Sequence, residues 1–204
     1  IGYGSACTKD EYPNGITEAQ ADILLREMLQ KFETSLDKFL QDSNLTLTDN
    51  QYDALISLTY NIGAGWMKDT RLSKLLQSGN YTNNEIASAI GIWCHVKENG
   101  VTSIHNGLVS RRIAEINVFL YGDYSGSDSG FCWVKFTSDK GSCERDIAFY
   151  ETGSTCNPFF TAECDDGDVF AGWYTSDGEE LTADMTVWQN LTVTARWQSE
   201  EFWY

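Results

Sequence analysis

The sequence has few basic residues and no long apolar run. Its 204 residues include 14 Lys and Arg against 30 Asp and Glu, which gives a formal net charge of −16. Nucleic acids and anionic membrane surfaces would repel such a chain, so the charge argues against both as partners. No stretch approaches the roughly 18 apolar residues that a membrane span needs, and no signal-peptide pattern is visible.

Histidine is also scarce, and the cysteines form no metal or redox motif. The two histidines lack metal-ligand spacing and none of the six cysteines lies in a CxxC pair. We therefore expect neither a zinc site nor a thiol redox motif. Four cysteines follow residue 130: Cys132, Cys143, Cys156 and Cys164. Disulfides there, and an extracellular or cell-surface location, are expected, with buried free thiols as the alternative.

A polar connector divides the chain into two parts. Residues 125–130 (SGSDSG) lack apolar periodicity and have the composition of a flexible linker. Residues 1–124 show helical periodicity and carry a net charge of −5, whereas residues 131–204 alternate as strands do and the chain from 125 onward carries −11. We predict an α+β chain, with a mostly helical domain followed by a small, all-β, β-grasp-like module.

Five helices are predicted in the first part. Capping boxes at 17–20 (TEAQ) and 48–51 (TDNQ) open the first two, and Gly63 ends the second. Three shorter helices are expected through Leu72 to Gly79, over about 83–93, and from Gly107 through Leu120. The opening Ile1-Gly2-Tyr3-Gly4 is predicted to be a short strand. In the second part, strands are predicted at 132–136, 147–150 and 191–197.

Four stretches of the first part resemble the phage-type lysozymes, the muramidases of glycoside hydrolase family 24. They are IGYG at 1–4, NGITEAQADILLRE at 14–27, LTDNQYDALISLTYNIGAG at 47–65 and GLVSRRIAEINVFLYG at 107–122. The third is the most specific. The resemblance implies a lysozyme-like domain that hydrolyses the β-1,4 bond between N-acetylmuramic acid and N-acetylglucosamine, with inversion and without a cofactor.

The resemblance also implies where the catalytic residues belong. The family uses a Glu, an Asp about nine residues later and a Thr or Ser about six residues after that, immediately before IGYG. Carried over residue by residue, all three precede Ile1, so no catalytic residue is assigned within this chain. We expect an N-terminally truncated sequence that is inactive or impaired as it stands. Glu11 follows IGYG and does not occupy the position of the acid.

Five residues are candidate contacts to the glycan, each with a structural alternative. Gly4 allows close approach of a sugar, or only tight backbone pairing. Asn61 could bond a sugar or, preferably, a loop carbonyl. Trp93, expected with His95 in a loop, could be a sugar platform, although burial in the core is favoured. Of Arg111 and Arg112, one is expected to reach the glycan or its peptide. The other would pair with Glu115, a contact worth only tenths of a kcal/mol.

The second part resembles a Listeria–Bacteroides repeat, a small module of bacterial surface proteins. The match rests on FAGWY at 170–174, Asp177-Gly178 and LTVTARW at 191–197. Together the two resemblances imply a monomeric lysozyme or endolysin acting on peptidoglycan glycan strands, secreted or released to the wall by lysis. The alternative is a non-catalytic surface protein that binds cell-wall glycan.

Overall fold

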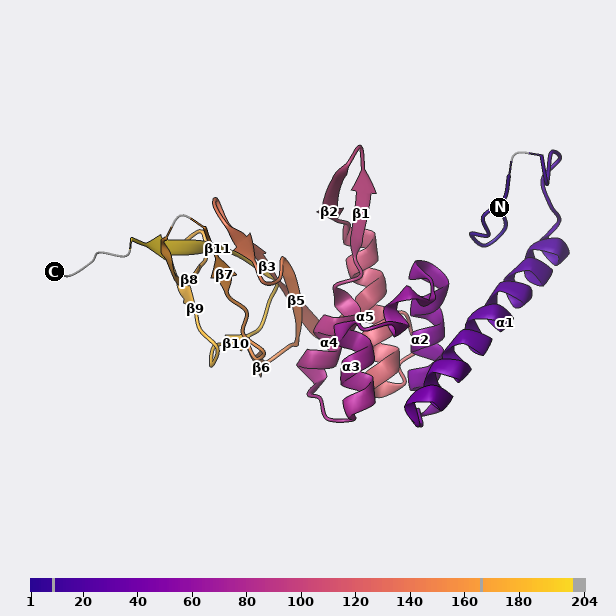
Figure 1. The fold of residues 1–204 in the computed structure, drawn as a ribbon, viewed down its shortest axis with the longest axis horizontal. Helices are drawn as coiled ribbons and strands as arrows, with labels where there is room; N and C mark the ends of the chain where they lie inside the picture. Colours follow the sequence, from indigo (N-terminus) through magenta and orange to yellow (C-terminus); the bar gives the residue numbers. More distant parts are fainter. Residues whose placement is uncertain (9, 166, 200–204) are drawn as a thin grey trace.

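The computed structural model describes residues 1–8, 10–165 and 167–199. The aromatic end of the predicted module, Phe202-Trp203-Tyr204, lies outside the described residues. Helices fill the first part of the chain and strands the second, which confirms the α+β prediction (Figure 1). No described helix combines the length and apolar character needed to cross a membrane.

Five α-helices lie among the described residues of the helical part, as predicted. They are α1 (Glu18–Ser43), α2 (Asp49–Ile62), α3 (Arg71–Ser78), α4 (Asn83–Gly91) and α5 (Asn106–Tyr121), with a short 3₁₀ helix, η1 (Ala64–Met67), after α2. The capping box of α1 is in place, because the Thr17 N–H donates to Gln20 Oε1 at 2.8 Å and the Gln20 N–H donates to Thr17 Oγ1 at 3.3 Å. These contacts span three residues, so the local sequence alone can specify where the helix begins.

The prediction of a strand at Ile1–Gly4 is wrong. This segment is a tight turn in which the Gly4 and Ser5 N–H groups donate to Ile1 O at 3.2 and 2.9 Å. Gly2 and Gly4 have φ angles of 56° and 107°, outside the extended region of a strand. The alternation of glycines that suggested a strand instead permits the turn.

A β-hairpin follows α4 where a loop was expected. Strands β1 (His95–Glu98) and β2 (Val101–Ile104) pair antiparallel and project from the helices in Figure 1. Asn99 and Gly100 form the two-residue turn, with φ angles of 50° and 84°. An Asn-Gly pair flanked by strand-forming residues is a strong hairpin signal, and it was available in the sequence.

The second part is built on a five-stranded mixed sheet in the order β5-β3-β11-β8-β9. Its strands are β3 (Phe131–Thr137), β5 (Ile147–Glu151), β8 (Val169–Tyr174), β9 (Glu180–Leu181) and β11 (Leu191–Gln198). The module also contains two short antiparallel pairs, which are β4 (Ser142–Cys143) with β7 (Ala162–Glu163) and β6 (Ser154–Thr155) with β10 (Thr186–Val187). All three predicted strands are present. Chain-distant β3 and β11 pair in parallel.

The module shares a hydrophobic core with the helices. Helix α4 packs on β5, and the buried rings of Phe131 and Phe149 belong to the same cluster as the leucines of α1 and α2. Gly91 of α4 lets the Phe149 ring approach its backbone, since a Cβ there would lie 2.1 Å from the ring. The Ser88 hydroxyl donates to Phe149 O at 3.0 Å and accepts from Phe149 N at 2.9 Å.

One buried amide adds further polar bonds across this seam between α4 and β5. Asn84 Nδ2 donates to Asn157 O at 2.9 Å and to Ser154 Oγ at 3.0 Å, and its Oδ1 accepts from Glu151 N at 2.8 Å. The connector is also held, because Asn117 Nδ2 donates to Ser127 O and to a second carbonyl of the 125–130 segment. Side-chain amides of the helical part thus hydrogen-bond to both the connector and the module, so the connector is not the flexible linker that its composition suggested.

The expectation of disulfides is wrong, because the structure joins none of the six cysteines, all of which lie among the described residues, in a disulfide. The module needs no covalent staple, because it has a hydrophobic core of its own and also buries Phe131, Ile147 and Phe149 against the helices. Its rings of Phe136, Phe160 and Trp173 pack together, with centroids 6.1 and 4.9 Å from that of Phe136, while β5 is buried against α4. Buried thiols such as Cys156 pack as small apolar side chains.

Candidate functional site

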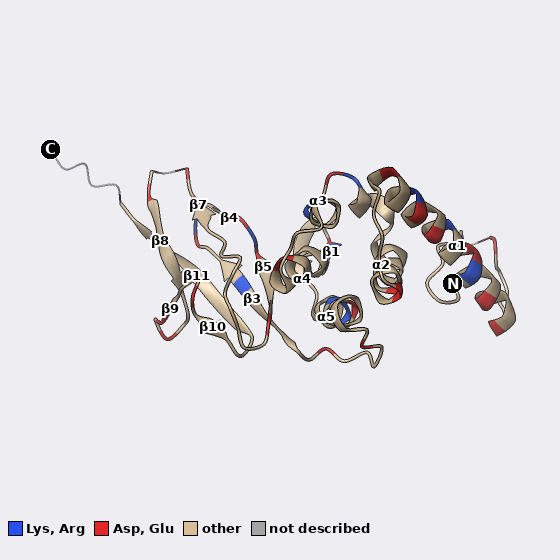
Figure 2. Ribbon diagram, turned by 90° about the horizontal axis from the view of Figure 1, so that it is seen from below, with Lys and Arg blue, Asp and Glu red and all other residues tan. Residues whose placement is uncertain are grey.

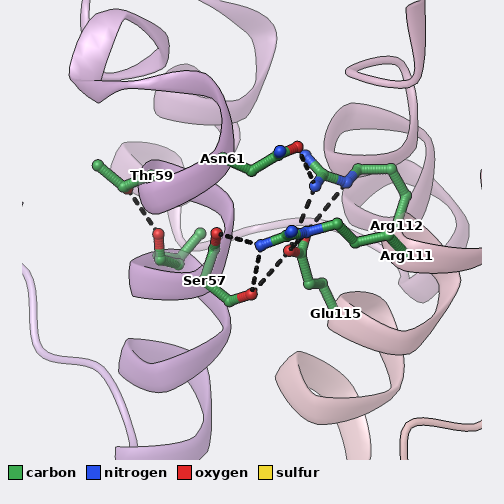
Figure 3. A network of polar contacts seen from close by, with 7 residues as sticks. Ser57, Thr59, Asn61, Arg111, Arg112 and Glu115 are labelled. Atoms are coloured by element: carbon green, nitrogen blue, oxygen red, sulfur yellow. Dashed lines mark hydrogen bonds and ion pairs between the residues drawn. The ribbon is translucent and has the colours of Figure 1, made fainter. Parts of the chain in front are cut away.

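Three of the five predicted glycan contacts meet between α2 and α5. Arg112 Nη2 donates to Asn61 Oδ1 at 2.7 Å, and Arg112 Nε lies 3.0 Å from Glu115 Oε2. Arg111 Nε donates to the other carboxylate oxygen, Glu115 Oε1, also at 3.0 Å, and Ser57 Oγ donates to that oxygen at 2.8 Å. Figure 3 shows the two guanidinium groups converging on the one carboxylate.

Burial sets the strength of this network. The Arg112 side chain is 0% exposed and that of Glu115 is 6% exposed. Burial lowers the pKa of Arg112, and the Glu115 carboxylate opposes that shift. The sequence predicted one arginine pairing with Glu115 as on a helix surface, worth tenths of a kcal/mol. Instead both arginines pair, and breaking a buried pair costs about 3–5 kcal/mol because an uncompensated charge remains.

The two arginines differ in what they can reach. Arg112 has no exposed surface, so its guanidinium is committed to holding Asn61 and Glu115. Arg111 is partly exposed and borders a cavity of about 370 Å³ with Ser57 and Tyr124. Asn61 is exposed at the end of α2, and its Nδ2 donates to none of the described residues. Arg112 therefore orients an amide whose donors face outward.

Gly4 lies beside the same end of α2. The neighbouring Tyr3 O accepts from the Tyr60 hydroxyl at 2.7 Å, and a Cβ on Gly4 would be 3.8 Å from that hydroxyl oxygen. Tyr60 directly precedes Asn61 in the chain, so the turn at the start of the chain contacts the residue next to the outward amide. Gly4 is exposed and leaves its backbone open on this side.

Trp93 lines a second cavity, which α2 borders with its last residue, Ile62. This cavity has a volume of about 480 Å³, and Ile62, Arg71, Trp93, His95 and Arg145 are among its lining residues. Trp93 is partly buried, so its indole is neither a free platform nor a closed core residue. His95 is fixed, with Nδ1 2.9 Å from Ile92 O and Nε2 2.6 Å from Asp146 Oδ2.

Glu11 has the wrong electrostatic environment for a glycosidase acid. The Thr8 N–H and the Thr8 hydroxyl donate to Glu11 Oε2 at 2.6 and 3.1 Å. These hydrogen bonds, the backbone one foremost, lower the pKa of Glu11 below its usual value. A general acid needs a carboxyl that stays protonated near neutral pH. The geometry agrees with leaving Glu11 out of the catalytic set.

The described residues also contain no cluster of three or more His, Cys, Asp or Glu side chains suited to a metal ion. The polar features that remain are an oriented amide, a partly exposed arginine and two cavities flanking α2. Such features suit the binding of a polar polymer such as a glycan strand, whose hydroxyl and amide groups need oriented donors and a partly apolar surface.

Comparison with known proteins decides the family. Residues 1–115 match the phage lysozyme family. This chain belongs to that family. The endolysin of Bacillus phage B103 is 36% identical over 123 residues, which are 60% of this chain and 43% of that protein. The endolysin of Bacillus phage PZA is 32% identical over 137 residues, 67% of this chain and 50% of that protein. The chain thus spans about half the length of these curated relatives.

A solved endolysin, from Escherichia coli O157:H7 phage FAHEc1, is 34% identical and aligns over 54% of this chain and 66% of its own length, with a TM-score of 0.48. The range that matches the phage lysozyme family falls within the predicted 1–124 domain and includes every predicted glycan contact. Sequence reasoning missed Ser57, although it lies one helical turn before Asn61 on α2. It also missed Arg71 and Arg145, which only the tertiary structure brings to one cavity.

Proposed function

We propose that this member of the phage lysozyme family serves the hydrolysis of peptidoglycan, at the β-1,4 bond between N-acetylmuramic acid and N-acetylglucosamine. The family match over residues 1–115 carries the proposal. The substrate would be the glycan strand, approached by a monomer that is secreted or released to the wall by lysis. No cofactor is required, because carboxyl groups alone can protonate the leaving oxygen and activate water.

The glycan contacts are proposed to lie around the C-terminal end of α2. Asn61 would donate its outward Nδ2 hydrogens to a sugar oxygen while Arg112 holds its Oδ1. Gly4 would admit a sugar close to its backbone, and Trp93 would present the edge of its indole. Arg111 would contact the strand from the cavity that it borders, while Arg112 acts by positioning Asn61.

The acid and its partners are proposed to belong to a segment preceding Ile1, where the family motif places them. The lowered pKa of Glu11, which follows from the Thr8 hydrogen bonds, supports this, since an ionised carboxylate cannot protonate a leaving group. The 131–204 module is proposed to be a repeat of the Listeria–Bacteroides kind that adapts the lysozyme domain to the bacterial surface.

The test is release of reducing sugar from purified peptidoglycan. Three proteins are compared: the chain as printed, the chain preceded by a segment carrying the Glu, Asp and Thr pattern, and the same extended chain with that Glu replaced by Gln. Cleavage by the second protein only is expected. Removing one acid from a glycosidase should reduce turnover by at least about a hundredfold.

Two other outcomes would change the assignment. Cleavage by the chain as printed would show that a carboxyl within residues 1–204 is the acid and would refute the upstream placement. If no protein cleaves but all sediment with the wall, the chain is a non-catalytic binder of cell-wall glycan. An Asn61→Ala variant separates the two roles, because it should weaken sedimentation without altering the extended chain's catalytic groups.

A further inference from the structure

Two arginines from distant parts of the chain meet at the seam between the helices and the module. Arg71 is the first residue of α3, and Arg145 lies in the loop before β5. Their guanidinium carbons are 5.8 and 5.9 Å from the centre of the same ring, Phe160. Figure 2 shows basic segments at the start of α3 and between β4 and β5, on the two sides of the seam.

Apart from the Phe160 ring, neither guanidinium has a hydrogen-bonding or ion-pairing partner among the described residues. Arg71 and Arg145 make no ion pair or hydrogen bond there, and Arg71 Nε is buried without an acceptor. This is unexpected in a chain with 30 acidic and 14 basic residues. The other close arginine pair, Arg111 and Arg112, has Glu115 between its members.

The nearby carboxylates are engaged elsewhere. Glu85 Oε2 accepts from the Thr82 N–H at 2.8 Å. Glu144 Oε2 accepts from the Thr161 N–H at 3.3 Å. Asp146 Oδ2 lies 2.6 Å from His95 Nε2. Each is held by a bond of its own and makes no ion pair with either guanidinium group. Glu85 acts on Arg71, and Glu144 and Asp146 act on Arg145, only through longer-range electrostatics.

The electrostatics point the same way. Burial lowers the pKa of Arg145, and the positive charge of Arg71 lowers it further, against the weaker opposing effect of Glu144 and Asp146. An anion placed between the two guanidinium groups would remove this repulsion and satisfy several N–H donors at once. Two cations held together without an anion resemble a binding site more than a structural contact.

The same arginines line the 480 Å³ cavity, whose other walls are mainly apolar. Ile62 and Leu72 are among them, with the indole of Trp93. Inorganic phosphate carries no aliphatic group to place against such walls. A peptide carboxylate beside a small aliphatic side chain matches both the guanidinium groups and the apolar lining.

We propose that this seam pocket, formed by Arg71 of the lysozyme domain and Arg145 of the module, binds the C-terminal carboxylate of the peptidoglycan stem peptide. The proposal rests on the proposed function for its substrate class and deepens it. The module then takes part in substrate recognition, because it supplies one of the two guanidinium groups. The pocket would select peptide-bearing over bare glycan.

The test measures binding by titration calorimetry, without turnover. The probes are a disaccharide-tetrapeptide from peptidoglycan, the same compound with its C-terminal carboxylate amidated, inorganic phosphate, and a neutral N-acetylglucosamine tetramer. On the unaltered chain, amidation should weaken binding by about tenfold to a hundredfold, the range for a charge-assisted hydrogen bond. The neutral tetramer should bind no better than the amidated compound, and phosphate should compete only at far higher concentration.

Variants locate the effect. Arg145→Gln and Arg71→Gln should each weaken binding of the carboxylate compound at least tenfold and remove the difference made by amidation. Arg145→Lys should retain part of it. Arg26→Gln, on the exposed face of α1, is the matched control and should change nothing.

Three results would overturn the proposal. One is an amidation effect that is absent on the unaltered chain, a comparison that needs no variant to fold. Another is an amidation effect that persists in both Gln variants. The third is phosphate that competes as well as the peptide, which would assign the pocket to phosphate groups. Because cleavage is not measured, failure of the pocket and failure of the muramidase assignment remain distinguishable.

Discussion

Gly91 offers the sharpest test of the seam between helix and module. Alanine at this position would place its Cβ 2.1, 2.3 and 2.8 Å from three carbons of the Phe149 ring. The shortest distance is about 1.3 Å below the 3.4 Å at which ordinary contact begins. Phe149 is fully buried, so its ring cannot move into solvent to relieve the clash.

Gly91→Ala should therefore destabilise the protein, although alanine is the better helix former. Overpacking of this kind costs about 1–3 kcal/mol. The gain in helix propensity is at most about 1 kcal/mol in a helix interior, and it is smaller here because Gly91 is the last residue of α4. With a urea slope of about 2 kcal/mol/M, the unfolding midpoint should fall by up to about 1 M.

Urea unfolding followed by circular dichroism measures the effect. Gly65→Ala is the control, since a Cβ there meets nothing within 4 Å. Its effect should stay within about 0.5 kcal/mol. Adding Phe149→Leu to Gly91→Ala should make the alanine less harmful than it is beside Phe149. A midpoint for Gly91→Ala equal to or above that of the unaltered chain would refute the packing of α4 on β5.

Two further predictions concern buried polar groups. Glu115→Ala should lower the free energy of unfolding by about 3–5 kcal/mol, because Arg112 would stay buried without its carboxylate. The control is Asp42→Ala, which breaks an exposed pair with Lys38 and should change little in the same urea experiment. Iodoacetamide at pH 8 should alkylate exposed Cys7 but not Cys94. The pKa of Cys94 is raised to about 11, mainly by burial and then by the charge of Asp146. Mass spectrometry should find all six cysteines alkylated after unfolding, and any disulfide-linked peptide would contradict the absence of disulfides in the structure.

The candidate site was partly predictable from sequence. The family motifs identified Asn61, Arg111 and Arg112, and the structure brings these residues together. Their division of labour was not predictable, because it depends on which guanidinium is buried. Arg112 is enclosed by α2 and α5 and orients Asn61, whereas Arg111 keeps an exposed side. Burial depends on how the helices pack together. The helical repeat in the sequence shows which face of a helix is apolar, but not which polar side chains the neighbouring helix covers.

Local contacts explain what the sequence determined by itself. The start of α1 depends on a bond between Thr17 and Gln20, and the β1–β2 hairpin on the Asn99-Gly100 turn. Each signal lies within a few residues, so the chain encodes it directly. Three strands of the module, β3, β5 and β11, were likewise predicted from apolar alternation, whereas β8 and the shorter strands were not.

Tertiary structure alone decided how the two parts meet. Gly91 fits Phe149, Asn84 bonds to the module backbone, and Arg71 comes to the same ring as Arg145. In each case the partners are more than fifty residues apart in the sequence. No local pattern marks such a pair, because glycine in a helix or an unpaired arginine gains its meaning only from the surface that folds against it. Local sequence patterns therefore predict the helices and several of the strands, whereas the seam and its pocket form only when the two parts pack together.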